Sequence, residues 1–178
     1  YSPATFPDMV RGTACRPYVQ RTLVPTIIWS ALEVIPRATR LEWDDALRDT
    51  PFVVATFETF HFTLRDPAAY LIGMAVVYAF LWGFVFSLRA LARGLYEMPR
   101  RLEDDLLLVG LGAVPAMFRY HNYLYDTATL CLMTLALALL VRRAWLWYLL
   151  VHLLACLNKE TAILLPLVYA LHFRSRLL

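Results

Sequence analysis

Apolar runs separated by short polar segments make up the second half of the chain. A helix needs ~20 apolar residues to cross a bilayer, and shorter runs suffice where flanking polar residues extend them or the membrane is locally thinned. The pattern therefore predicts five transmembrane helices. They are expected at about Ala68–Leu91, Asp105–Phe118, Asp126–Val141, Ala144–Leu157 and Glu160–Phe173.

Shorter apolar segments precede these runs and cannot span a bilayer. Thr22–Ile35 is apolar, carries Glu33, and predicts an in-plane or re-entrant helix. Arg37–Arg48 mixes both signs of charge and predicts a short solvated helix. Pro51–Leu64 has apolar residues at three- and four-residue intervals, which is typical of an amphipathic interfacial helix. Residues 1–67 are thus expected to form an outer segment, and residues 68–178 an all-α polytopic membrane bundle.

The composition supports an integral membrane protein. The chain is 60% hydrophobic and 17% charged, whereas soluble domains are about 45–50% apolar and about 25% charged. A net charge of +3 gives no case for a nucleic-acid partner. The chain does not start with Met, and we expect it to be an internal piece of a longer protein or a processed or incompletely observed product, with a further helix upstream. Cys131 and Cys156 are expected to be buried small hydrophobic residues.

The distribution of basic residues predicts the orientation. If the expected spans alternate, one side receives eight arginines, and the loops of the other side after Ala68 receive only Arg119 and Lys159. The segment before Ala68 holds seven arginines of its own, and long translocated segments escape this rule. Cytoplasmic loops of membrane proteins carry the excess of Lys and Arg. The first side is therefore expected to be cytoplasmic, with Tyr1–Pro67, Tyr120–Asp126 and Asn158–Thr161 on the outer side. The eight arginines are Arg89, Arg93, Arg100, Arg101, Arg142, Arg143, Arg174 and Arg176.

Two of the outer segments combine aromatic and charged side chains. Arg16 and Arg21 flank Tyr18, and two guanidinium groups suit a lipid phosphate or a less specific contact with lipid headgroups. Tyr125 and Asp126 close a tyrosine-rich loop that suits a sugar or an interfacial aromatic belt. Asp126 is also a plausible helix N-cap.

The third outer segment, Asn158-Lys159-Glu160-Thr161, lies between two apolar runs. It can be a simple turn in which Asn158 caps the next helix and Glu160 favours its first turn through the helix dipole. Ionisable residues at a membrane edge are also functional candidates, which makes Lys159 a candidate site residue. His152 is expected to be a packing residue. Asp8 and Asp44-Asp45 are weak candidates for a general base or a metal ligand.

Three segments together resemble motifs of bacterial membrane glycosyltransferases of the GT-C type. Arg16-Pro17-Tyr18-Val19-Gln20-Arg21-Thr22-Leu23-Val24-Pro25 is similar to an "RPYVYRxLxP" pattern of an outer loop. Tyr123-Leu124-Tyr125-Asp126-Thr127-Ala128-Thr129-Leu130 resembles the opening of an outer-to-inner helix. Leu157-Asn158-Lys159-Glu160-Thr161-Ala162-Ile163-Leu164-Leu165-Pro166 is similar to "LNRETxLLLP". The three occur in order over most of the chain.

The resemblance implies a multi-pass protein of the bacterial cytoplasmic membrane that transfers a sugar from a polyprenyl-phosphate donor on the non-cytoplasmic face. Such enzymes have a catalytic acid just after their first helix, a helix that this sequence does not contain. The acid is then either absent from this sequence together with that helix, or it is Asp8. The implied partners are membrane lipid and the lipid-linked sugar, and no cofactor or metal ligand is assigned. A non-catalytic membrane subunit and a small transporter-like protein remain alternatives. The implied substrate-binding residues are Arg16, Tyr18, Arg21, Tyr125, Asp126, Asn158, Lys159 and Glu160.

Overall fold

The computed structural model describes residues 6–13, 21–59, 66–118 and 125–174, and these form helices and their connections with no strand among them. The prediction of an all-α chain is therefore confirmed. Two compact units divide the chain, Tyr1–Val76 and Val77–Leu178. Their boundary falls inside one helix, α5 (Pro67–Leu95).

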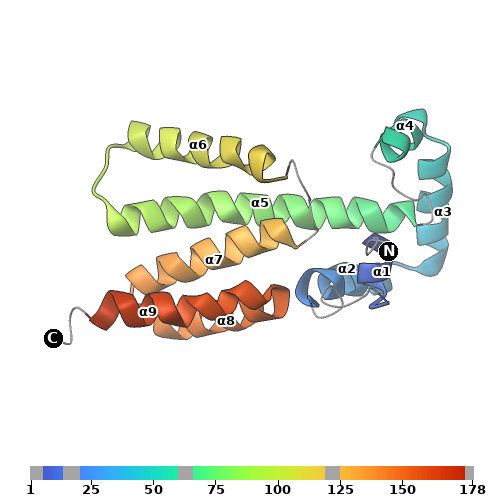
Figure 1. Cartoon of the computed structure of the whole chain (residues 1–178). Helices are drawn as coiled ribbons and strands as arrows, with labels where there is room; N and C mark the ends of the chain where they lie inside the picture. Colours follow the sequence, from blue (N-terminus) through green and yellow to red (C-terminus); the bar gives the residue numbers. More distant parts are fainter. Residues whose placement is uncertain (1–5, 14–20, 60–65, 119–124, 175–178) are drawn as a thin grey trace. The chain divides into compact units, whose positions relative to one another are not determined.

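The first unit contains α1 (Phe6–Val10), α2 (Leu23–Val34), α3 (Arg37–Arg48), α4 (Pro51–Thr59) and the beginning of α5 (Figure 1). Contacts join α1 to α2 and α3 to α4. The helices expected within Thr22–Ile35 and Arg37–Arg48 are confirmed. Residues 60–65 of the expected Pro51–Leu64 helix lie outside the described residues.

The start of α5 is fixed by groups that satisfy its first backbone N–H groups. Pro67, which has no N–H, is the first helical residue, as Asp66-Pro67 predicts. The Ala68 N–H donates to the Oδ1 atom of Asp44 at 2.8 Å, and the Ala69 N–H donates to the Asp66 carbonyl at 3.1 Å. The weak candidate base Asp44 is thus engaged in holding α3 to the start of α5.

The second unit contains the rest of α5, α6 (Arg100–Phe118), α7 (Asp126–Val141), α8 (Trp145–Asn158), the 3₁₀ turn η2 (Glu160–Ile163) and α9 (Leu164–Arg174). Phe84, Val114 and Cys131 form a buried cluster between α5, α6 and α7. Gly83 allows this close approach, because a Cβ atom there would lie 2.7 Å from the Cys131 Sγ. Cys131 is buried as expected, whereas Cys156 is exposed on α8, which corrects that prediction.

One helix of the described residues, α5, is long and apolar enough to cross a membrane. The other expected spans are helical but shorter or more charged: α6 begins with a charged run, and α7 and α8 have 16 and 14 residues. At 1.5 Å per residue, α7 is roughly 24 Å long, compared with ~30 Å of hydrocarbon core. The helices are confirmed, and their expected crossing of a membrane stays a prediction.

A charged cluster joins α5 to α6 in the second unit. Glu103 is only 6% exposed, and its carboxylate accepts hydrogen bonds from the Arg93 Nε at 3.0 Å and from the Arg89 Nε at 3.4 Å. The Arg89 Nη2 also bonds the Asp104 Oδ1 at 2.8 Å. The hydrogen bond from Arg93 lowers the pKa of Glu103 below its ordinary value of 4.5, against the opposing effect of burial.

This lowered pKa predicts acid sensitivity. Because the folded state holds the Glu103 carboxylate in its charged form, its stabilising contribution is complete above the ordinary pKa of 4.5 and declines as the pH falls from there through the lower folded pKa. We expect Glu103→Gln to flatten the loss of thermal stability below about pH 4.5. Thermal unfolding at a series of pH values measures this.

Asp105→Asn supplies the control for the acid series. Asp105 is exposed on the same helix, and no ion pair or hydrogen bond joins its side chain to another described residue. This variant should keep the wild-type pH dependence. If Glu103→Gln and wild type lose stability in parallel between pH 5 and pH 3, the proposed contribution of the Glu103 cluster is wrong.

Candidate functional site

The end of α8 lies beside the start of α7. The two helices are antiparallel neighbours with extensive contacts (Figure 1), and a tight turn at residues 142–144 reverses the chain between them. In this turn the Arg143 N–H donates to the Leu140 carbonyl and the Ala144 N–H to the Leu139 carbonyl, each at 3.0 Å. Arg143 takes the left-handed conformation, φ 58°, that this helix ending requires. The turn therefore returns Asn158 to the level of Tyr125.

Asn158 fastens the two helices through its amide group. Its Nδ2 donates to the Tyr125 carbonyl at 3.0 Å and to the Thr129 Oγ1 at 2.9 Å. The Thr129 hydroxyl in turn donates to the same Tyr125 carbonyl at 2.9 Å. Asn158 is 1% exposed, and its Oδ1 has no hydrogen-bond partner among the described residues. The side chain is thus committed to α7.

Lys159 follows in an extended conformation, φ −158° and ψ 139°, which ends α8. Its Nζ lies 3.0 Å from the Asp126 Oδ1, and the two side chains are 27% and 19% exposed. The same ammonium lies 5.5 Å from the centre of the Tyr125 ring, within cation–π range. A carboxylate and an aromatic face therefore hold this cation in place near the chain surface.

The helix caps expected at these positions are wrong. Asn158 is the last residue of α8 and does not cap the following turn, whose N-cap position is Lys159 without a side-chain bond. Asp126 is the first residue of α7 instead of its N-cap, and Tyr125 takes the cap position. The Asn158 side chain instead bonds to the start of α7, and the Asp126 side chain pairs with Lys159 just after α8. Glu160 opens η2 and is exposed.

The structure thus brings together four of the residues singled out in the sequence, namely Tyr125, Asp126, Asn158 and Lys159. Thr129 is a member of this cluster that sequence analysis missed. Its spacing of four residues from Tyr125, which places both on one side of α7, is the signal that could have identified it.

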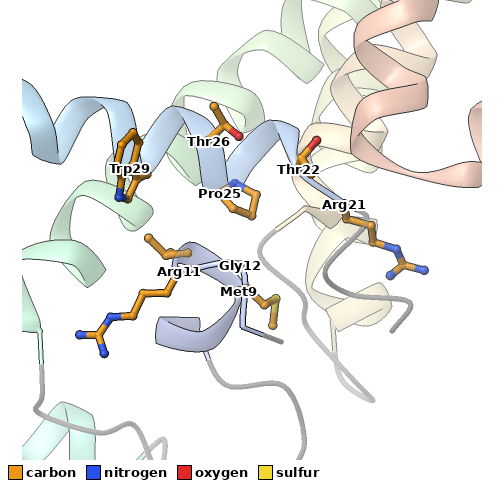
Figure 2. Close-up of a pocket in the computed structure, with 9 residues that line it drawn as sticks. Met9, Arg11, Gly12, Arg21, Thr22, Pro25, Thr26 and Trp29 are labelled. Atoms are coloured by element: carbon orange, nitrogen blue, oxygen red, sulfur yellow. The ribbon is translucent and has the colours of Figure 1, made fainter. Parts of the chain in front are cut away.

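Two of the other candidates lie in the first unit. Asp8 is half-buried in α1, and its Oδ1 accepts a long hydrogen bond of 3.5 Å from the Thr13 hydroxyl. Arg21 lines a cavity of about 330 Å³ between α1 and α2, together with Arg11 and Trp29. Figure 2 shows the Arg11 and Arg21 side chains at opposite ends of this cavity, so their two guanidinium groups do not converge on one position in it. Arg16 and Tyr18 lie outside the described residues.

His152 has the packing role expected for it. Its ring stacks on the Tyr148 ring, with centroids 5.9 Å apart and planes 5° apart, and the Cys156 Sγ lies 3.7 Å from its Nε2. Within the described ranges, no group of three His, Cys, Asp or Glu side chains is arranged to hold a metal ion.

No family model, curated protein or solved structure matches this chain. Any functional assignment therefore depends on the residues themselves.

Proposed function

We propose that the chain is part of a multi-pass membrane glycosyltransferase of the GT-C type, which transfers a sugar from a polyprenyl-phosphate donor on the non-cytoplasmic face of the bacterial cytoplasmic membrane. Lys159 would contact the phosphate of the donor. The observation that carries this proposal is the Lys159–Asp126 ion pair at the end of an apolar helical hairpin, held in place by the buried Asn158.

The surface of α8 supports a membrane environment. Its buried residues form one stripe, Tyr148, Val151, Ala155 and Asn158, at intervals of three and four residues. Large apolar side chains cover the remaining surface and are exposed in this chain. Soluble proteins rarely expose contiguous patches of this kind, whereas lipid or further helices would cover them. The exposed residues are Trp145, Leu146, Trp147, Leu149, Leu150, Leu153, Leu154 and Leu157.

The chemistry of Lys159 suits a departing phosphate. When the bond between the anomeric carbon and the phosphate oxygen breaks, negative charge collects on the lipid phosphate. A nearby fixed cation stabilises that charge more than it stabilises the bound donor. Without a bound donor, the Asp126 carboxylate neutralises the Lys159 ammonium. With a donor bound, the ammonium would contact both this carboxylate and the donor phosphate. Asn158 would act as a positioning residue, because its bonds to Tyr125 and Thr129 hold the end of α8, and with it the following Lys159, beside the start of α7.

The other roles rest on the residue types and on the resemblance. These are the general base for Asp8, phosphate contacts for Arg16 and Arg21, and substrate contacts for Tyr18, Tyr125, Asp126 and Glu160.

A non-catalytic membrane subunit is the second candidate. It is favoured by the fact that Lys159 already has a carboxylate and an aromatic partner inside the chain. The cluster would then only fasten the hairpin to α7. In that case the loss of Lys159 would reduce stability without a specific effect on catalysis.

The test is sugar transfer by the full-length protein in proteoliposomes supplied with radiolabelled polyprenyl-phosphate hexoses. We expect Lys159→Met to lower transfer per folded molecule by about 100-fold, which is typical of removing one electrostatic stabiliser of a transition state. Lys159→Arg keeps the cation and should lose about tenfold or less. Thermal unfolding of each variant gives the folded fraction.

Two results would contradict the proposal. One is the absence of transfer by the wild-type protein with every hexose donor. The other is unchanged transfer per folded Lys159→Met molecule, which would favour the subunit function.

A further inference from the structure

A second cavity, of about 280 Å³, lies within the first unit beside the start of α5. Residues from the end of α1, from α2, from α3 and from the start of α5 line it. The charged members comprise three arginines and two aspartates, so the lining carries a formal charge of +1. These residues are Arg11, Arg37, Arg40, Asp44 and Asp66.

Both carboxylates of this cavity are engaged by neighbouring groups of the protein. Asp66 forms an ion pair with Arg11. Asp44 accepts the Ala68 backbone N–H at 2.8 Å, which satisfies one of the first N–H groups of α5. The two aspartates are therefore occupied with Arg11 and with the backbone of α5.

Arg37 and Arg40 are the remaining charged groups. They are three residues apart on α3, which places them on one side of that helix. Arg40 is half-buried, and within the part of the chain that the structure describes neither guanidinium has an ion-pair or hydrogen-bond partner. Two neighbouring guanidinium groups at the wall of a cavity form an electropositive site that suits an anion with several oxygens.

The surroundings indicate the source of such an anion. Trp29 lines the cavity and is 52% exposed, and Trp43 on α3 is 43% exposed. Exposed Trp residues beside Arg are typical of the headgroup region of a membrane. The cavity also lies at the start of α5, the helix that is long enough to cross a bilayer.

We propose that this cavity binds a phosphate group, supplied by the headgroup of an anionic phospholipid, through Arg37 and Arg40. The bound lipid would anchor α2 and α3 at the membrane surface where α5 begins. This site is independent of the proposed sugar transfer, because none of its residues belongs to the Lys159 cluster.

Native mass spectrometry of the full chain, released from detergent with added phosphatidylglycerol or phosphatidylcholine, tests the proposal. We expect wild type to retain phosphatidylglycerol in preference to phosphatidylcholine. Arg37→Gln with Arg40→Gln should weaken phosphatidylglycerol binding by about tenfold, as expected for losing two charge-assisted contacts at a partly exposed site.

Arg100→Gln with Arg101→Gln is the matched control. It removes the same charge from an exposed helix start elsewhere, and should leave phosphatidylglycerol binding unchanged. Arg37→Lys with Arg40→Lys keeps both charges but not the planar guanidinium groups, and should show an intermediate loss. Circular dichroism of each variant verifies that it is folded.

Inorganic phosphate, added in the same experiment, distinguishes the source of the ligand. Binding of inorganic phosphate that is lost in Arg37→Gln with Arg40→Gln, without any preference for phosphatidylglycerol, would overturn the lipid assignment in favour of a soluble phosphate. Equal phosphatidylglycerol binding by wild type and the folded double Gln variant would overturn the site itself.

Discussion

Asn158→Asp is expected to lower the free energy of unfolding of the second unit by about 2–4 kcal/mol, because it replaces a buried hydrogen-bond donor with a charged acceptor. The substitution changes one atom of the side chain and hardly changes its volume. In the wild-type protein the Nδ2 atom donates to the Tyr125 carbonyl and to the Thr129 hydroxyl oxygen. An aspartate oxygen at that position would meet the lone pairs of the Tyr125 carbonyl at a site that is 1% exposed.

Two further variants separate the contributions to this effect. Asn158→Leu loses both hydrogen bonds but buries no charge, and should cost about 1–3 kcal/mol, because the Tyr125 carbonyl keeps the Thr129 N–H and hydroxyl as donors. Thr129→Val removes one acceptor and should cost about 1 kcal/mol. Thermal or denaturant unfolding of the full chain in lipid–detergent micelles measures the series. A wild-type melting temperature for Asn158→Asp would show that Asn158 does not contact α7.

Lys159→Met should also destabilise the second unit, by about 2 kcal/mol. The substitution removes the cation that pairs with the Asp126 carboxylate. This ion pair is partly buried, with side-chain exposures of 27% for Lys159 and 19% for Asp126. Exposed pairs contribute about 0–1 kcal/mol, and breaking a buried pair costs about 3–5 kcal/mol.

Asp126→Asn should cost less, about 1 kcal/mol, for two reasons. The remaining Lys159 ammonium keeps its contact with the Tyr125 ring and part of its solvent exposure. Asparagine also retains an oxygen that can accept a hydrogen bond from the ammonium. Denaturant unfolding of both single variants gives these two values.

The extent of the helices could be predicted from the sequence, because long apolar runs and polar interruptions mark them directly. The expected Asp126–Val141 segment coincides with α7, and Asp66-Pro67 marks the start of α5. What the pattern cannot show is which surface each helix buries. In α8 nearly every residue is apolar, so the buried stripe does not stand out from the exposed leucines.

The same difficulty explains the wrong capping predictions. Asn158 is in register with the buried residues Tyr148, Val151 and Ala155, and this register turns its side chain toward α7. Within Asn158-Lys159-Glu160 itself, the local pattern is a polar residue before an expected helix, which usually indicates an N-cap. The bond to Tyr125 spans 33 residues and depends on the tight turn at Arg143. Long-range bonds of this kind are not encoded in local spacing.

The two cysteines of the apolar runs differ in burial. A small sulfur-containing residue in an apolar run was expected to be buried, and Cys131 is buried against Gly83. Cys156 directly follows Ala155 of the buried stripe, and a step of one residue rotates a side chain by about 100° around a helix. It therefore lies on the exposed side of α8 in this chain.

The Asn158–Lys159 segment is a polar site docked on the start of α7 and not a free turn between two helices. A double-mutant cycle with Asp126→Asn, Lys159→Met and the combined variant tests this docking most directly, by unfolding of the full chain in lipid–detergent micelles. We expect a coupling free energy of about 1–2 kcal/mol, with the combined variant no less stable than Lys159→Met alone. Additive effects of the two substitutions would contradict it.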